Sequence, residues 1–369
     1  MTSKEIVEKT LSYQCPERVA RSFGDLAAGE ASGEAGSDFV LVKADVKTRA
    51  TDWVMVDSTS SPQVENGKWE RFDEWGNLWH RLDSASNGEV GKPALDDVSQ
   101  IDDYELPDYS NPADYKCVAE ERARYPDKWL IGETAGFAFG IGRYILGLES
   151  YLAALTLERE RVKILHDKID VVLEQMIRNY AAAGADCIFF AEDWGTQSQL
   201  FIRPQLWYEE FFGRFQKLCS IARQCGIKVF MHSCGQIGAI VPGLMKAGVD
   251  VLQFDQPDLH GVETIARYQE QGRITFWCPV DIQKTLQTRN EKIIRDKAKE
   301  MLDKLWKGRG GFIAGYYPDN AAIGLDPKWQ DYACQEFLKY GKRIRHFDPS
   351  TSLSAGFAQC RQAHRRRRS

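Results

Sequence analysis

The chain changes its hydrophobic pattern at about residue 128. Beyond Lys128, short apolar runs typical of buried strands alternate with longer stretches in which apolar residues recur every three or four positions. The clearest helical stretch extends from Val162 to Tyr180 and keeps one face apolar. The strand-like runs lie at 129–132, 185–191, 229–231, 249–254, 274–277 and 311–314. Alternation of this kind predicts a parallel sheet covered by helices.

The N-terminal third is less regular. Residues 1–26 have an amphipathic helical pattern, and residues 27–37 form a small, polar segment that we interpret as a flexible loop and candidate lid. Two β-rich runs, 39–42 and 53–56, are candidates for two further barrel strands, and residues 69–82 alternate aromatic and polar positions around a Gly-Asn turn, as a hairpin does. We therefore predict a single α/β domain over residues 1–348, a (β/α)8 TIM barrel with N-terminal helical and hairpin additions, followed by a disordered tail at 349–369.

Composition narrows the classes of partner. A formal net charge of -5 with 27% charged residues describes an ordinary surface, so we expect no nucleic-acid partner despite the four arginines at 365–368. The nine cysteines follow no disulfide framework, which favours reduced thiols and a cytoplasmic protein. No apolar stretch is long enough to cross a bilayer, so we expect no membrane partner. The sequence leaves a homodimer open.

Ionisable and soft side chains follow the predicted strands. The carboxyl ends of barrel strands meet at one mouth, where active sites of such barrels lie. Ten candidate residues stand at these ends: Glu133, Glu192, Asp193, His232, Cys234, Asp255, Cys278, Asp281, Tyr316 and Tyr317.

His232 and Cys234 are the candidate metal ligands. Residues two apart on a strand share a face, and an imidazole with a thiolate suits zinc, which needs a third ligand. Cys278, Asp193 and Asp255 are the candidates for that third position. The alternative is a strand-end histidine hydrogen-bonded to backbone beside a buried thiol.

The acids and tyrosines have two interpretations each. Asp193 and Asp255 either belong to the site or cap a helix or pair with an arginine such as Arg143 or Arg203. A tyrosine at 316 or 317 could donate a proton, but neighbouring strand residues point in opposite directions, so at most one faces the pocket.

Seven short motifs taken in order carry a resemblance. They are D-E-W-G at 73–76, A-G-A-D at 183–186, D-W-G-T-Q at 193–197, H-S-C-G at 232–235, A-G-V-D at 247–250, P-V-D-I-Q at 279–283 and G-G-F-I at 310–313. This set resembles the uroporphyrinogen decarboxylase superfamily, which implies a single (β/α)8 barrel.

Two branches of that superfamily are relevant. The decarboxylases use an N-terminal arginine motif, which the segment C-P-E-R-V-A-R at 15–21 does not match well. The corrinoid-dependent methyltransferases are more similar, because the resemblance implies that His232 and Cys234 bind zinc together with a later cysteine. That cysteine would fall near Tyr316 and Tyr317, where this chain has none.

The resemblance implies a methyltransferase of a corrinoid system. It would move a methyl group from a small O-methyl substrate, expected to be a methoxylated aromatic, to cob(I)alamin on a partner corrinoid protein. We assign catalytic roles to Asp193, Glu192, Asp255 and Tyr316, substrate binding to Glu133, Trp194, Cys278, Asp281 and Tyr317, and zinc binding to His232 and Cys234. The alternatives are a decarboxylase of a tetrapyrrole or polyacid, a methylcobalamin-to-thiol or -pterin methyltransferase, and a non-catalytic binding barrel.

Overall fold

The computed structural model describes residues 1–23, 36–57, 68–82 and 88–343. The predicted loop at 27–37 lies almost entirely outside these residues, and the predicted tail at 349–369 lies wholly outside them. Among the described helices, none combines the length and the apolar character that crossing a membrane requires.

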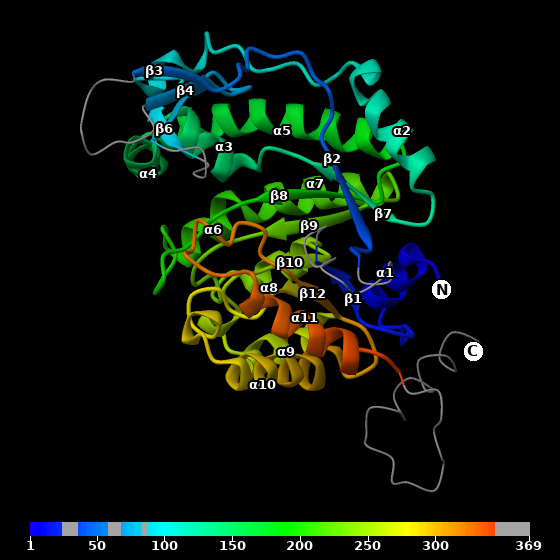
Figure 1. The fold of residues 1–369 in the computed structure, drawn as a ribbon. Helices are drawn as coiled ribbons and strands as arrows, with labels where there is room; N and C mark the ends of the chain where they lie inside the picture. Colours follow the sequence, from blue (N-terminus) through cyan, green and yellow to red (C-terminus); the bar gives the residue numbers. More distant parts are fainter. Residues whose placement is uncertain (24–35, 58–67, 83–87, 344–369) are drawn as a thin grey trace, which may run out of the picture.

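Eight parallel strands form the predicted barrel (Figure 1). From the second strand on, each strand pairs with the next in chain order, and the first strand pairs with the last rather than with the second. The sheet nearly closes because the Asp38 N–H, just before the second strand, donates to the Arg21 carbonyl at 2.9 Å. The Asp38 carboxylate strengthens this seam by accepting from the Arg18 guanidinium at 2.8 Å and from the Arg21 N–H at 2.9 Å. The strands are β1 (Ala20–Ser22), β2 (Phe39–Val42), β7 (Trp129–Glu133), β8 (Cys187–Ala191), β9 (Lys228–His232), β10 (Val251–Gln253), β11 (Thr275–Cys278) and β12 (Phe312–Gly315).

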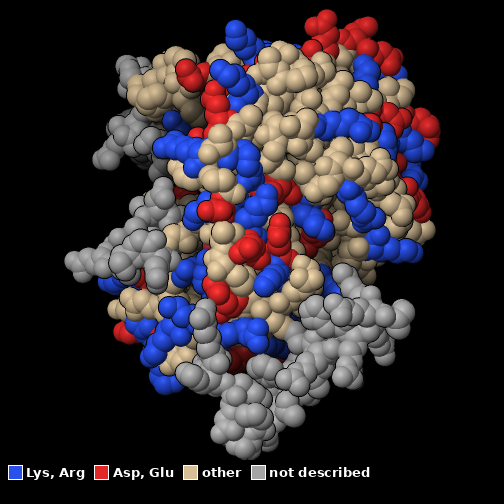
Figure 2. Space-filling model, turned by 90° about the vertical axis from the view of Figure 1, so that its right-hand side faces the viewer, with Lys and Arg blue, Asp and Glu red and all other residues tan. Residues whose placement is uncertain are grey.

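Helices surround the strands (Figure 1). The longest, α5, follows β7 and includes the predicted apolar face. The helices are α1 (Ser3–Leu11), α2 (Lys116–Arg124), α3 (Ala138–Ile145), α4 (Leu148–Leu157), α5 (Arg159–Ala182), α6 (Pro204–Glu210), α7 (Phe212–Gln224), α8 (Val241–Ala247), α9 (Val262–Gly272), α10 (Glu291–Met301) and α11 (Lys328–Tyr340). On the side where α1 and α2 lie, Figure 2 shows basic and acidic side chains interspersed, so the described part of that face carries no broad patch of one sign.

Two N-terminal predictions need correction. The helix expected over 1–26 ends at Leu11, and residues 20–22 form a barrel strand instead. The run at 53–56 is a strand, but it is not part of the barrel. It forms β3 (Val54–Asp57) of an antiparallel sheet with β4 (Lys68–Phe72), β5 (Leu78–Arg81) and β6 (Glu89–Lys92). The expected hairpin at 69–82 is confirmed as the β4–β5 pair.

Two apolar cores lie on opposite sides of the barrel wall. The inner core fills the barrel with one side chain or more from most strands, among them Phe39, Phe230 and Ile313, and includes Ile6 and Val7 of α1. The outer core packs the other faces of the strands against the helices. Because strand side chains alternate, this division determines which strand-end residues point into the barrel mouth.

Candidate metal centre

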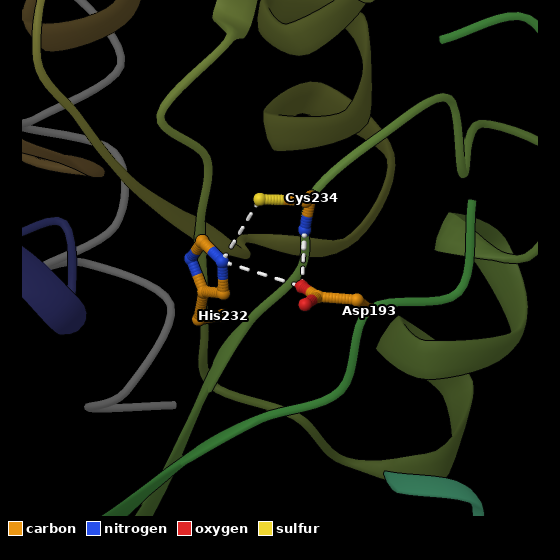
Figure 3. A group of neighbouring side chains, drawn as sticks. All are labelled: Asp193, His232 and Cys234. Atoms are coloured by element: carbon orange, nitrogen blue, oxygen red, sulfur yellow. Dashed lines mark hydrogen bonds and ion pairs between the residues drawn. The ribbon is translucent and has the colours of Figure 1, made fainter. Parts of the chain in front are cut away.

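Three ligand-type side chains meet at the ends of β8 and β9 (Figure 3). The ligand atoms of Asp193, His232 and Cys234 all lie within 4.8 Å of one another. His232 Nε2 is 3.3 Å from Cys234 Sγ and 3.4 Å from Asp193 Oδ1. An imidazole nitrogen, a thiol sulfur and a carboxylate oxygen are three donors that zinc accepts. The donor set therefore fits a zinc ion with one position left for substrate.

The two loops that carry these residues are joined by hydrogen bonds. The Trp194 N–H donates to Ser233 Oγ at 3.3 Å, and the Gln236 N–H donates to the Thr196 carbonyl at 2.8 Å. Gly235 has a φ of +81°, and a Cβ there would lie 2.2 Å from the Gly195 carbonyl oxygen. Only glycine fits that turn, so the glycine of the H-S-C-G motif allows the Cys234 loop to approach the Asp193 loop.

The other side of the His232 ring faces β10. Its Nδ1 is hydrogen-bonded to Gln253 Oε1, and Gln253 Nε2 donates to Asp255 Oδ1 at 2.7 Å. Asp255 Oδ2 is 3.9 Å from the same Nδ1. Asp255 therefore lies beside the centre, but on the side of the ring opposite Asp193 and Cys234.

Negative groups dominate the electrostatics of this centre. Burial lowers the pKa of His232, but Asp193, Cys234 and Asp255 outweigh it and hold that pKa well above its ordinary value. Burial raises the pKa of Asp193, yet its hydrogen bonds and the charges of His232 and Arg143 bring the pKa below the usual range. Arg143 lies 3.5 Å from Asp193 Oδ2 and also donates to the Asp193 carbonyl at 3.0 Å, so the expected arginine partner is present. The arrangement favours a cation.

Three predicted site residues lie behind the barrel wall instead. Glu192 is fully buried, and its Oε1 accepts from the Phe137 and Gly140 N–H groups at the start of α3. Burial raises the pKa of Glu192 to about 8. Trp194 packs in the outer core, and so does Cys278. The structure does not bring these three to the metal ligands, and their predicted roles find no support in this geometry.

Asp281 and Glu133 also differ in whether their side chains are directed into the barrel mouth. Asp281 is buried and accepts from the backbone N–H groups of Asp258, Gln283 and Lys284, which is the role of a loop anchor. Alternation directs Glu133 into the mouth, since Ile131 two residues earlier lies in the inner core.

The two tyrosines differ in their surroundings. The Tyr316 hydroxyl accepts from the Asn320 amide at 3.1 Å. Tyr317 is held through its backbone, since its N–H donates to Gln330 Oε1 at 2.9 Å and its carbonyl accepts from Gln330 Nε2 at 2.7 Å. Burial and the nearby Asp255 and Cys234 raise the pKa of Tyr317. The pKa of Tyr316 responds instead to Asp331 and Cys334, so Tyr317 is the tyrosine nearer the centre, although both pack against the outer core.

Sequence reasoning did not find Gln253. The signal was present, because a glutamine within the buried run V-L-Q-F at 251–254 requires polar partners. Gln253 also precedes Asp255 by two residues, so both point into the mouth.

Comparison with known proteins identifies the family. The family model described as uroporphyrinogen decarboxylase (URO-D) matches residues 82–316, which is more than half of the chain. The protein belongs to the uroporphyrinogen decarboxylase family. Comparison of the chain with curated proteins found no match.

Solved structures resemble the fold of this uroporphyrinogen decarboxylase family protein. A methyltransferase from Methanosarcina mazei is similar with a TM-score of 0.54 at 15% identity, over 69% of this chain and 73% of the other. A B12-independent methionine synthase from Shewanella sp. W3-18-1 has a TM-score of 0.41 at 10% identity, over 72% and 71% of the two chains. At 15% identity the similarity to the Methanosarcina mazei protein concerns the fold alone.

Proposed function

We propose that this protein is the substrate-side methyltransferase of a corrinoid system, removing a methyl group from a small O-methyl compound such as a methoxylated aromatic. The observation that carries the proposal is the convergence of Asp193, His232 and Cys234 at the barrel mouth. Two further observations support it: the chain belongs to the uroporphyrinogen decarboxylase family, and it carries the H-S-C-G motif at 232–235.

Zinc is the cofactor that this donor set fits. His232 Nε2, Cys234 Sγ and Asp193 Oδ1 would hold it, and Asp193 replaces the later cysteine that the methyltransferase branch led us to expect. Bound zinc supplies Lewis-acid polarisation of a substrate oxygen. A carboxylate is a harder ligand than a second thiolate, so this set suits an oxygen leaving group.

The protein's own residues must manage the charge on that oxygen. When the methyl carbon leaves, both electrons of its bond stay on the oxygen, which becomes negative. The electron pair for the new bond to carbon comes from the methyl acceptor, which we propose to be cob(I)alamin on a partner corrinoid protein. Tyr317 would donate a proton to the leaving oxygen. Because its pKa is raised, the phenol of Tyr317 is protonated at neutral pH and carries a proton to donate as the bond to the methyl carbon breaks.

A thiol acceptor is the second candidate. The ligand set is complete with Asp193, so a substrate thiolate could occupy the fourth zinc position. A polyacid decarboxylase fits less well, because Glu133, Asp193 and Asp255 all point into the mouth and would repel a substrate with many carboxylates.

Elemental analysis and a turnover assay test the proposal. We expect about one zinc per chain in the purified protein. We also expect conversion of free cob(I)alamin to methylcobalamin with a methoxylated aromatic. The matched assay supplies methylcobalamin and a thiol, and faster turnover there would favour the thiol candidate. A protein that binds no zinc and turns over neither pair would contradict the proposal.

A further inference from the structure

Gln253 is a buried polar residue of strand β10 that touches a candidate metal ligand. Its exposed fraction is 8%, and β10 is otherwise apolar. A buried amide is costly unless both its donor and its acceptor find partners. Gln253 has both, since its oxygen meets His232 Nδ1 and its nitrogen donates to Asp255 at 2.7 Å.

Asp255 fixes the orientation of this amide. The NH₂ group of Gln253 donates to Asp255 Oδ1, so the carbonyl oxygen of the same amide faces His232. A carbonyl oxygen only accepts, which requires that His232 Nδ1 carry a proton. The chain Asp255–Gln253–His232 therefore determines which ring nitrogen is protonated.

The consequence appears on the other side of the ring. With Nδ1 hydrogen-bonded to Gln253, Nε2 is the ring nitrogen that faces Asp193 Oδ1 at 3.4 Å and Cys234 Sγ at 3.3 Å. These three ligand atoms face one another, and a metal ion that displaces the proton of Nε2 would bind between them.

We propose that Gln253 is a positioning residue that holds His232 with Nδ1 protonated and Nε2 free to bind the metal. This inference rests on the proposed zinc site. Asp255 acts through Gln253 by orienting its amide. Partners of this kind around metal ligands typically contribute 10- to 100-fold to metal affinity.

Zinc competition against a chelator measures the contribution. Gln253→Leu should weaken zinc binding by about 10- to 100-fold. Gln253→Glu combined with Asp255→Asn keeps an acceptor for the Nδ1 proton and an amide donor beside it, and should recover most of the affinity. Gln256→Leu is the matched control, because Gln256 is another buried glutamine just beyond β10, and its side-chain oxygen accepts from the Gln197 amide at 3.0 Å. Wild-type affinity in Gln253→Leu would overturn the proposal.

Nitrogen NMR tests the same inference at the ring nitrogens themselves. Long-range ¹H–¹⁵N correlation on histidine-labelled protein reports the protonation of each ring nitrogen, and His232→Ala assigns the signal among the six histidines. We expect a proton on His232 Nδ1 and none on Nε2 in the zinc-loaded wild-type protein. An unprotonated Nδ1 would overturn the role of Gln253 even if Gln253→Leu fails to fold. If the wild-type protein binds no zinc but His232 Nδ1 is protonated, only the proposed metal is contradicted.

Discussion

Asp193 and Glu192 are neighbouring carboxylates with opposite surroundings. Asp193 points into the barrel mouth beside His232, and its pKa lies below the usual range because hydrogen bonds and positive charges outweigh burial. Glu192 points behind the wall toward α3, where burial raises its pKa to about 8. One step along the chain therefore separates a group able to bind a cation from one that anchors a helix.

Two histidines repeat this contrast. His232 at the mouth is hydrogen-bonded to Asp193 and Cys234 and lies near Asp255, and together these neighbours raise its pKa. His166 is a fully buried residue of α5, and its pKa is lowered because burial is the largest influence on it. Its ring contacts the Tyr151 hydroxyl at 2.7 Å and Glu210 Oε1 at 2.9 Å. The side of the barrel wall, more than the residue type, determines what these groups can do.

The largest expected difference concerns the metal ligands. His232→Ala and Cys234→Ala should each reduce zinc from about one per chain to near zero, since two protein ligands rarely hold the ion. Cys278→Ala is the matched change behind the wall. It should keep its zinc and lose only about 1 kcal/mol of the free energy of unfolding. Elemental analysis and denaturant titration check both, and zinc loss in Cys278→Ala would break the comparison.

The second largest expected difference is in zinc affinity, between variants of the two neighbouring carboxylates. Asp193→Asn replaces an anionic ligand with a neutral amide and should cost more than the roughly 100-fold in zinc affinity that outer partners contribute. Glu192→Gln should bind zinc like the wild type, because its amide oxygen can still accept from the Phe137 and Gly140 N–H groups. Chelator competition measures both affinities. Equal losses would mean that the two carboxylates are not functionally distinct.

The tyrosine pair tests proton donation. Tyr317→Phe should lower kcat for demethylation by about 100-fold or more, the usual contribution of a general acid, with KM nearly unchanged. Tyr316→Phe removes only the hydroxyl bonded to Asn320 and should leave kcat within about twofold of the wild type, as expected for a residue without such a role. A larger effect at Tyr316 would reverse the assignment.

The smallest expected effect is a pH dependence of stability. His166 has a folded-state pKa below its unfolded value of 6.5, so the unfolded chain binds the proton first and stability falls as pH drops below about 6.5. Going from pH 7.5 to 5.5 should cost up to about 1.4 kcal/mol through this group. Glu210 and Asp167 act against the lowered pKa, whereas Arg214 supports it. Denaturant midpoints of the wild type and His166→Gln check this, and identical pH slopes would contradict it.

The fold was predictable where strands are long and apolar. The runs at 185–191 and 229–231 identify β8 and β9 because burial on both faces needs continuous apolar sequence. The three residues of β1 were missed because Arg21 and Ser22 give no such signal, and the strand depends on β12 and on the Asp38 seam. Local pattern identified β3 as a strand but could not identify the sheet to which it belongs.

The sequence predicted the residue types of the site better than the direction in which each side chain points. The H-S-C-G motif indicated His232 and Cys234, and Asp193 was one of three candidates for a third ligand. Alternation could have separated Asp193 from Glu192 once Cys187 and Phe189 were known to face the inner core. That knowledge comes from the closed barrel, so the sequence alone left both as candidates.

X-ray absorption at the zinc edge of the purified protein tests the central claim most directly. The Asp193, His232 and Cys234 site predicts one sulfur at about 2.3 Å and two or three nitrogen or oxygen ligands at about 2.0–2.2 Å. Asp193→Asn should alter the light-atom shell, while Cys278→Ala should leave the spectrum unchanged. Two sulfur ligands, or a spectrum that changes with Cys278, would place the metal elsewhere and contradict the account.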